Sequence, residues 1–187
     1  MRYVSDSGTS AKGCRMVDDR KVLLGLGSNE AGPWGEPAEA IERALAELDG
    51  RGVIVTRVSR LIVTEPIGQP GQPRYANAVA AGETRLAPEA LLTLLKELEH
   101  AAGRRPGPRW GARPLDIDLL DFARMVQGWD TAHDPEHPAH LVLPHPELHK
   151  RRFVLEPLVE IAPAWRHPVL GMTAAELLAQ LRQTGTA

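Results

Sequence analysis

The strongest constraint on the fold lies between Pro114 and Phe122, where two aspartates, Asp116 and Asp118, interrupt an otherwise apolar stretch. Alternation of apolar and polar residues over this length is typical of a half-buried β-strand. Side chains two residues apart on a strand point to the same face, so the two carboxylates are expected to stand side by side. Because adjacent carboxylates repel each other, burying them is costly unless a cation compensates their charge.

Hard oxygen ligands of this kind suit Mg²⁺, which proteins usually hold through one or two carboxylates together with substrate phosphates. Four arginines precede the aspartates in a segment interrupted by glycines and prolines, and guanidinium groups pair well with phosphate oxygens. These arginines are Arg104, Arg105, Arg109 and Arg113. Together the residues indicate phosphoryl-group chemistry, although an Asp-x-Asp pair alone also occurs by chance and in other metal-dependent folds.

The composition indicates one globular domain. The 187 residues carry a net charge of −2, which gives no indication of a nucleic-acid or anionic-membrane partner. The one cysteine, Cys14, leaves no intrachain disulfide, and no apolar run approaches the ~20 residues of a membrane span. We therefore expect a cytoplasmic protein with one domain over residues 21–187, preceded by a polar, disordered extension over residues 1–20.

The secondary structure is predicted from the spacing of apolar residues. Apolar or β-branched runs predict four strands, and helical spacing predicts two helices between them. In chain order these elements cover residues 21–26, 36–48, 53–64, 75–83, 87–102 and 114–122. Further helices are predicted over residues 154–161 and 174–181. This order predicts the α+β class, with a ferredoxin-like β-α-β-β-α-β sandwich, an antiparallel sheet and extra C-terminal helices.

Three further positions have two interpretations on the residues alone. Tyr75 and Asn77 share one strand face and could bind a heterocycle, but a core tyrosine beside a capped asparagine fits as well. Gly27 could let the backbone lie against a flat ligand, or it could belong to a plain strand-to-loop turn. Glu99, in the last turn of the second helix, could reach into a pocket, although a solvated glutamate is the commoner fate.

Six motifs follow one another along the chain from about Lys21 to Leu181. They are Gly25-Leu26-Gly27-Ser28-Asn29, Thr64-Glu65-Pro66-Ile67-Gly68, Tyr75-Ala76-Asn77-Ala78, Glu99 with Gly103-Arg104, Arg109-Trp110-Gly111 through Leu115-Asp116-Ile117-Asp118, and Leu143-Pro144-His145 with Arg151-Arg152-Phe153. In this order they resemble the 6-hydroxymethyl-7,8-dihydropterin pyrophosphokinase family of folate biosynthesis. The resemblance implies transfer of pyrophosphate from ATP to the pterin hydroxymethyl group, with release of AMP.

The resemblance also implies residue roles. Asp116 and Asp118 would hold two Mg²⁺ ions, and Arg104 and Arg113 would act with them in catalysis by neutralising the phosphates. Contacts with ATP, the co-substrate, are implied for Lys96, Glu99, Arg109, Trp110, Ile117, His145 and Arg151. Contacts with the pterin are implied for Gly27, Thr64, Glu65, Pro66, Ile67, Tyr75, Asn77, Trp110 and Phe153.

Three residues depart from the family pattern. Lys96 stands where better-known members carry glutamine near the nucleotide, His140 where arginine is common, and Pro146 where tyrosine follows the histidine. Because one fold hosts many functions, two other classes stay open: a non-catalytic ferredoxin-like module that binds a nucleotide or a partner protein, and another Asp-x-Asp transferase, nucleotidyl or glycosyl. We expect a monomer that acts on small molecules and has no nucleic-acid or membrane partner.

Overall fold

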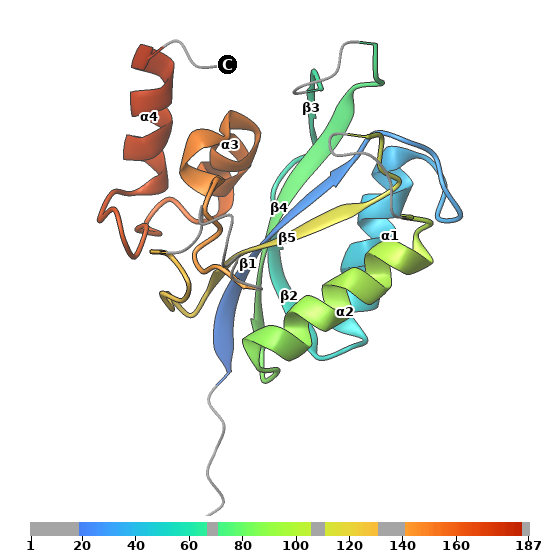
Figure 1. Cartoon of the computed structure of the whole chain (residues 1–187), viewed down its shortest axis with the longest axis horizontal. Helices are drawn as coiled ribbons and strands as arrows, with labels where there is room; N and C mark the ends of the chain where they lie inside the picture. The colour runs from blue at the N-terminus through green and yellow to red at the C-terminus, as the bar shows by residue number, and fades with distance from the viewer. Residues whose placement is uncertain (1–18, 67–70, 106–110, 131–140, 185–187) are drawn as a thin grey trace, which may run out of the picture.

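A computed structural model describes residues 19–66, 71–105, 111–130 and 141–184 of the chain (Figure 1). In chain order the elements within these residues are β1 (Arg20–Ser28), α1 (Pro37–Asp49), β2 (Val53–Val58), β3 (Ile62–Thr64), β4 (Tyr75–Thr84), α2 (Pro88–Ala101), β5 (Asp116–Phe122), the 3-10 turn η1 (Leu148–Lys150), α3 (Arg152–Ile161) and α4 (Ala174–Thr184). The extension expected over residues 1–20 lies outside the described residues as far as residue 18, and β1 already begins at Arg20.

The strands form one antiparallel sheet in the order β2-β4-β1-β5, and β3 pairs with the first residues of β4. The predicted α+β class with an antiparallel sheet is confirmed. Gly27 of β1 pairs with Asn77 of β4 on one side and with Asp116 of β5 on the other. This register places three of the predicted site residues in one row across the sheet.

The strand predicted over residues 53–64 is in fact two strands, because the chain is interrupted at Ser59. Ser59 donates its backbone N–H to the Val79 carbonyl (2.9 Å), and its hydroxyl oxygen accepts the Val79 N–H (3.0 Å). A side chain thus takes the place of a backbone carbonyl in the ladder, and the regular pairing ends there. Pairing resumes at Ile62 and brings Thr64 opposite Tyr75.

Two hydrophobic cores lie on opposite faces of the sheet. On one face, Leu26 and Ile117 share a core with Leu95 of α2 and with residues of α1. On the other face, Leu120 of β5 shares a core with Leu155 of α3 and with residues of α4. Figure 1 shows the two pairs of helices on either side of the sheet. Within the described residues, no helix has the length and apolar character needed to cross a membrane.

The alternation along β5 decides where its two carboxylates point. Ile117 and Leu119 belong to the core beneath α1 and α2, so Asp116 and Asp118 point to the opposite face. Leu120 shares that face and packs against α3 and α4, but neither aspartate belongs to their core. The two side chains remain 24% and 30% exposed, so this end of the sheet face is open to a ligand.

Candidate active site

Asp116 is held by two arginines from the segment that precedes β5. Nη1 of Arg104 donates to Oδ1 of Asp116, and Nη1 of Arg113 donates to Oδ2 at 2.8 Å. Burial works to raise the pKa of Asp116, but the charges of Arg104 and Arg113 outweigh it and hold this pKa below its usual value. Asp116 is therefore a carboxylate at neutral pH, and its oxygens already face cationic groups.

Asp118 has its own basic partners. Nη1 of Arg151, the residue directly before α3, donates to Oδ2 of Asp118 at 3.2 Å, and Nε2 of His145 lies 3.8 Å from the same oxygen. Nδ1 of His145 accepts the Glu147 N–H (3.1 Å), so the neutral ring carries its proton on Nε2, toward Asp118. Burial lowers the pKa of His145, although the charge of Asp118 acts in the opposite direction. The two aspartates thus meet different basic groups.

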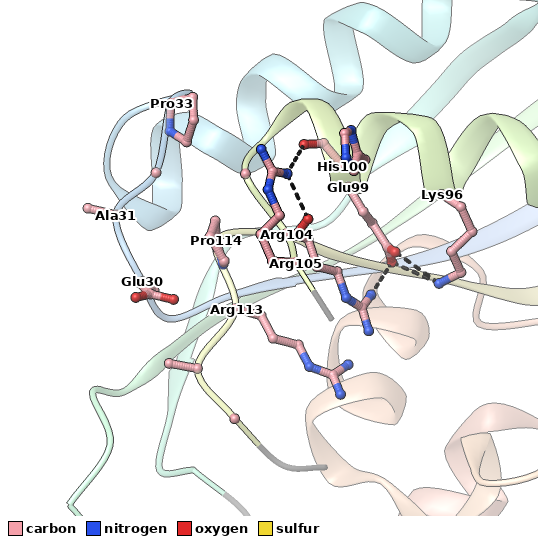
Figure 2. A pocket seen from close by; sticks show the side chains of 14 residues that line it. Glu30, Ala31, Pro33, Lys96, Glu99, His100, Arg104, Arg105, Arg113 and Pro114 are labelled. Atoms are coloured by element: carbon pink, nitrogen blue, oxygen red, sulfur yellow. Dashed lines mark hydrogen bonds and ion pairs between the residues drawn. The ribbon is translucent and has the colours of Figure 1, made fainter. Parts of the chain in front are cut away.

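Arg104 and Arg113, the two arginines that contact Asp116, also line a cavity of about 800 Å³. The cavity lies between the end of α2, the loop after β1 and the segment before β5. Figure 2 shows Arg104 and Lys96 on either side of Glu99, Arg113 on the segment before β5, and Glu30 on the loop after β1. This volume is large enough for a nucleotide-sized ligand.

Glu99 is the most deeply buried acidic side chain of this cavity, with 2% of its surface exposed. One of its oxygens accepts the backbone N–H of Ile117 at 2.8 Å, and both accept from Nζ of Lys96 at 3.0 Å. Nη1 of Arg104 lies 2.6 Å from the first oxygen. Burial raises the pKa of Glu99, and these three partners act against that rise. Glu99 is therefore occupied by protein groups rather than presented to a ligand.

The residues expected to bind the pterin gather beside Asp116. Asn77 is 5% exposed and donates through Nδ2 to Oγ1 of Thr64 at 2.9 Å. Gly27 lies next to Asn77, and a Cβ there would come within 3.2 Å of its Oδ1. Tyr75 donates its hydroxyl to the Gly111 carbonyl at 3.4 Å, and burial raises the pKa of this hydroxyl. These contacts orient the aromatic ring and the amide next to the carboxylates.

Phe153 comes from the first turn of α3 and lies on the side of Asp118. The guanidinium carbon of Arg151 is 5.8 Å from the centre of its ring, so the ring adjoins the arginine that contacts Asp118. Glu65 does not join the cluster, because its side chain is 72% exposed and pairs with Arg74 at 2.7 Å. Pro66 follows it and is half-buried. Three predicted contact residues lie outside the described residues: Ile67, Arg109 and Trp110.

Asn29 joins the two sides of the site and was absent from the predicted site residues. It is 1% exposed, and its Oδ1 accepts the backbone N–H of Arg113 at 2.8 Å. Its Nδ2 donates to Oε1 of Gln72 and to the Pro73 carbonyl, both at 3.2 Å. The signal in the sequence was its place at the end of the first motif, directly after the first strand, but its partners are more than 40 residues away.

The donor atoms at Asp116 and Asp118 fit Mg²⁺. The described residues contain no group of three or more His, Cys, Asp or Glu side chains that could enclose a metal by themselves. A pair of partly exposed carboxylates on neighbouring same-face positions nevertheless suits an ion that takes its remaining ligands from water and substrate phosphates. Hard oxygen ligands without thiolate or clustered imidazole favour Mg²⁺ over zinc.

The family model of 7,8-dihydro-6-hydroxymethylpterin-pyrophosphokinase (HPPK) matches residues 23–163 of the chain. A 2-amino-4-hydroxy-6-hydroxymethyldihydropteridine pyrophosphokinase of Pseudomonas aeruginosa is 38% identical over 161 residues, which cover 86% of this chain and 91% of the relative. The mitochondrial folate synthesis bifunctional protein of Arabidopsis thaliana is 37% identical over 157 residues, 84% of this chain. The matched region is only 26% of that relative, so the chain spans about a quarter of the bifunctional protein.

Solved structures show the same fold at lower sequence identity. A wild-type HPPK-DHPS of Plasmodium falciparum with pteroate has a TM-score of 0.61 at 15% identity, covering 87% of this chain and 42% of that chain. Another HPPK-DHPS, in complex with substrates, has a TM-score of 0.65 at 13% identity, covering 90% of this chain and 44% of that chain. At this identity the likeness supports the fold alone.

Proposed function

Since the chain belongs to the 7,8-dihydro-6-hydroxymethylpterin-pyrophosphokinase family, we propose that it transfers pyrophosphate from ATP to 6-hydroxymethyl-7,8-dihydropterin in folate biosynthesis. The products are the pterin diphosphate and AMP. The observation that carries this proposal is the row Asn77, Gly27 and Asp116 across one sheet face. This row places the amide of Asn77, which can hydrogen-bond a heterocycle, beside the carboxylate of Asp116, which is paired with two arginines.

We propose that Asp116 and Asp118 hold Mg²⁺, with two ions expected. When bound, the metal neutralises phosphate charge and polarises the phosphorus that is attacked. The protein's own contribution is to fix both carboxylates on β5 and to keep Asp116 ionised. The low pKa of Asp116, held down by its arginines against the effect of burial, serves this purpose. Ile117, between the two aspartates, is fixed through its backbone N–H.

The arginines bind the triphosphate of ATP. Arg104 and Arg113 hold Asp116 in this structure, and phosphate oxygens are equally suitable partners for a guanidinium group. We propose that both arginines would pass from Asp116 to the phosphates, which would leave the carboxylate free to hold Mg²⁺. Arg151 and His145 would likewise pass from Asp118 to the phosphates. Charge is thereby placed around the phosphates before transfer, which is the main contribution of proteins to phosphoryl chemistry.

The pterin lies beside Gly27, between aromatic side chains. Tyr75 is fixed by its bond to Gly111, and Phe153 approaches from α3. Asn77 is fixed by its hydrogen bond to Thr64, and its amide forms hydrogen bonds with the edge of the pterin ring. The contacts of the pterin with Glu65, Pro66, Ile67 and Trp110 stay predictions. For Glu65 and Pro66 we propose that the backbone, and not the side chain, contacts the pterin.

The finer topology that we propose is ferredoxin-like. If β2 and β3 are taken as one interrupted strand, the chain runs β-α-β-β-α-β with the sheet order β2-β4-β1-β5, and this supports the assignment. A monomeric state and a cytoplasmic location stay predictions from the sequence.

Product analysis tests the proposed function. The protein is mixed with ATP, Mg²⁺ and 6-hydroxymethyl-7,8-dihydropterin, and the nucleotides and pterins are separated. We expect equal amounts of AMP and pterin diphosphate, none of either after chelation of the metal, and recovery when Mg²⁺ is restored. Formation of ADP would mean a simple kinase, and nucleotide binding without turnover would mean a binding module.

A further inference from the structure

A series of charged side chains runs from the surface of α2 to the first aspartate of β5. Nζ of Lys96 lies 3.0 Å from both oxygens of Glu99, and Nη1 of Arg104 lies 2.6 Å from one of them. The same Nη1 contacts Oδ1 of Asp116. Figure 2 shows Lys96 and Arg104 approaching Glu99 from two directions. Glu99 therefore has two cationic partners, and Arg104 has two anionic ones.

The two partners of Glu99 come from different parts of the chain. Arg104 follows Gly103, whose φ of +105° places the chain in a turn, and its guanidinium faces the cavity. Lys96 lies one helical turn before Glu99 on α2, so the helix keeps the two side chains within reach of each other. The side chain of Lys96 is 52% exposed, whereas that of Glu99 is 2% exposed. The contact between Lys96 and Glu99 therefore does not depend on the position of Arg104.

A buried carboxylate without a cationic partner is strongly disfavoured. If Glu99 relied on Arg104 alone, any movement of Arg104 to a phosphate would leave that buried charge uncompensated. Glu99 would then tend to take up a proton or to turn toward solvent, and its hydrogen bond from the backbone N–H of Ile117 would weaken or break. With Lys96 in place, Glu99 keeps a cationic partner. It also keeps its hydrogen bond from the backbone N–H of Ile117, the residue between the two aspartates.

We infer that Lys96 is a positioning residue that acts through Glu99 and frees Arg104 to bind the triphosphate. The inference rests on the proposed function, since it assumes that Arg104 leaves Glu99 and Asp116 for phosphate. It differs from the contact with ATP that the family resemblance implies for Lys96 and Glu99. In this account neither side chain touches the nucleotide.

A double-mutant cycle of Lys96→Met and Glu99→Gln separates these two roles. The readout is the dissociation constant of a non-hydrolysable ATP analogue with Mg²⁺, measured by calorimetry on the full chain. Alone, Lys96→Met should weaken binding about three- to tenfold, the range for partial loss of a charged partner. In the Glu99→Gln background the same change should alter binding less than about twofold, because there is no buried charge left to compensate.

Equal losses in both backgrounds would overturn the inference, because they would mean that Lys96 touches the nucleotide itself. The thermal midpoint of the free Lys96→Met variant should stay close to that of the parent, since Arg104 still compensates Glu99 there; a fall in the midpoint as large as the binding loss would indicate a merely structural lysine. Lys96→Arg should restore binding. Glu97→Gln, a charge change on the same helix at a side chain 62% exposed, is the matched control and should leave binding unchanged.

The proposed function fails separately from this inference. If the unmodified protein forms AMP and pterin diphosphate but the cycle is additive, only the role of Lys96 is wrong. If the unmodified protein binds no nucleotide or forms neither product, the proposed function is wrong and the role of Lys96 is rejected with it.

Discussion

Gly27 lies between Asn77 and Asp116 in the sheet, and its lack of a side chain keeps the proposed pterin site open. A Cβ there would lie 3.2 Å from Oδ1 of Asn77 and 3.8 Å from Cδ1 of Tyr75. Asn77 has little freedom to yield, because its Nδ2 is bonded to Thr64. One added methyl group would therefore displace a side chain of the proposed pterin site without touching either core.

Gly27→Ala is expected to lower kcat/KM for the pterin by about tenfold or more, since small displacements at a reacting site have large effects. The thermal midpoint should change by no more than a few degrees. Steady-state kinetics and thermal unfolding measure the two effects. Gly50→Ala is the matched control, because Gly50 has a right-handed helical φ of −73° and a Cβ there would meet nothing closer than 3.7 Å. Parental kinetics in Gly27→Ala would contradict the placement of the pterin.

Asp118→Asn tests the carboxylate pair at the same scale. Loss of one charged metal ligand should reduce turnover at saturating substrates by about a hundredfold or more. The fold should survive, because Asp118 is partly exposed and belongs to neither core. The rate of AMP formation is compared with that of Asp49→Asn, a change at an exposed residue at the end of α1. A rate for Asp118→Asn near that of the control would exclude Asp118 as a metal ligand.

At the scale of elements, β5 and the segment before it form one unit of the proposed site for metal and nucleotide, because both arginines of that segment contact Asp116. Arg104 and Arg113 both donate to Asp116, so a Mg²⁺ ion held by this carboxylate would compete with their guanidinium groups for its oxygens. Phosphates offer both arginines a new partner. We therefore expect metal and nucleotide binding to be coupled through the exchange of arginine partners.

Mg²⁺ alone should consequently bind weakly, and a non-hydrolysable ATP analogue should tighten its binding by about tenfold or more, within the usual range of coupling between sites. Calorimetric titration of Mg²⁺ with and without the analogue measures this effect. Arg113→Gln should reduce the coupling, because one of the exchanging groups is absent. Independent binding of metal and nucleotide would show that the arginines do not change partners.

The elements show how far sequence reasoning reached. The helices at α1, α2 and α3 and the aspartates of β5 were predictable, because apolar periodicity records which face each element buries. The break at Ser59 was not, since it depends on a bond with Val79 across the sheet. The same holds for Asn29, whose partners come from two distant loops, and for Glu99, whose oxygens are taken by Ile117 and Lys96. Contacts between distant segments leave no local pattern in the sequence.

At the scale of the whole molecule, a cluster of rings holds the C-terminal third together. His167 is fully buried, with its ring centre 5.2 Å from that of Trp129, 5.7 Å from that of Trp165 and 5.9 Å from that of His149. Burial, aided by the nearby His149, lowers the pKa of His167 to about 4. Its Nδ1 accepts backbone N–H groups, which requires an unprotonated nitrogen.

The folded protein should therefore lose stability as the pH falls from about 6.5 toward 4. The pKa of His167 is lower in the folded state than its ordinary 6.5, so its contribution is fully present above pH 6.5 and is lost as protons bind the unfolded state preferentially. The free energy of unfolding should fall by a few kcal/mol. Each pH unit between the pKa of His167 in the unfolded state and that in the folded state contributes about 1.4 kcal/mol. Denaturant unfolding at several pH values measures it.

His167→Asn keeps an acceptor near the position of Nδ1 and cannot titrate. Its free energy of unfolding should depend less on pH over this range, even if its stability at pH 7 is lower. An unchanged slope in His167→Asn would show that other groups cause the acid sensitivity.

ATP labelled with ³²P at the β-phosphorus shows whether the chain transfers the two terminal phosphoryl groups of ATP together. The labelled ATP is incubated with Mg²⁺ and 6-hydroxymethyl-7,8-dihydropterin, and the radioactive products are separated. We expect the label to move to the pterin diphosphate and the AMP to be unlabelled. Label retained in ADP, or released as pyrophosphate, would contradict it.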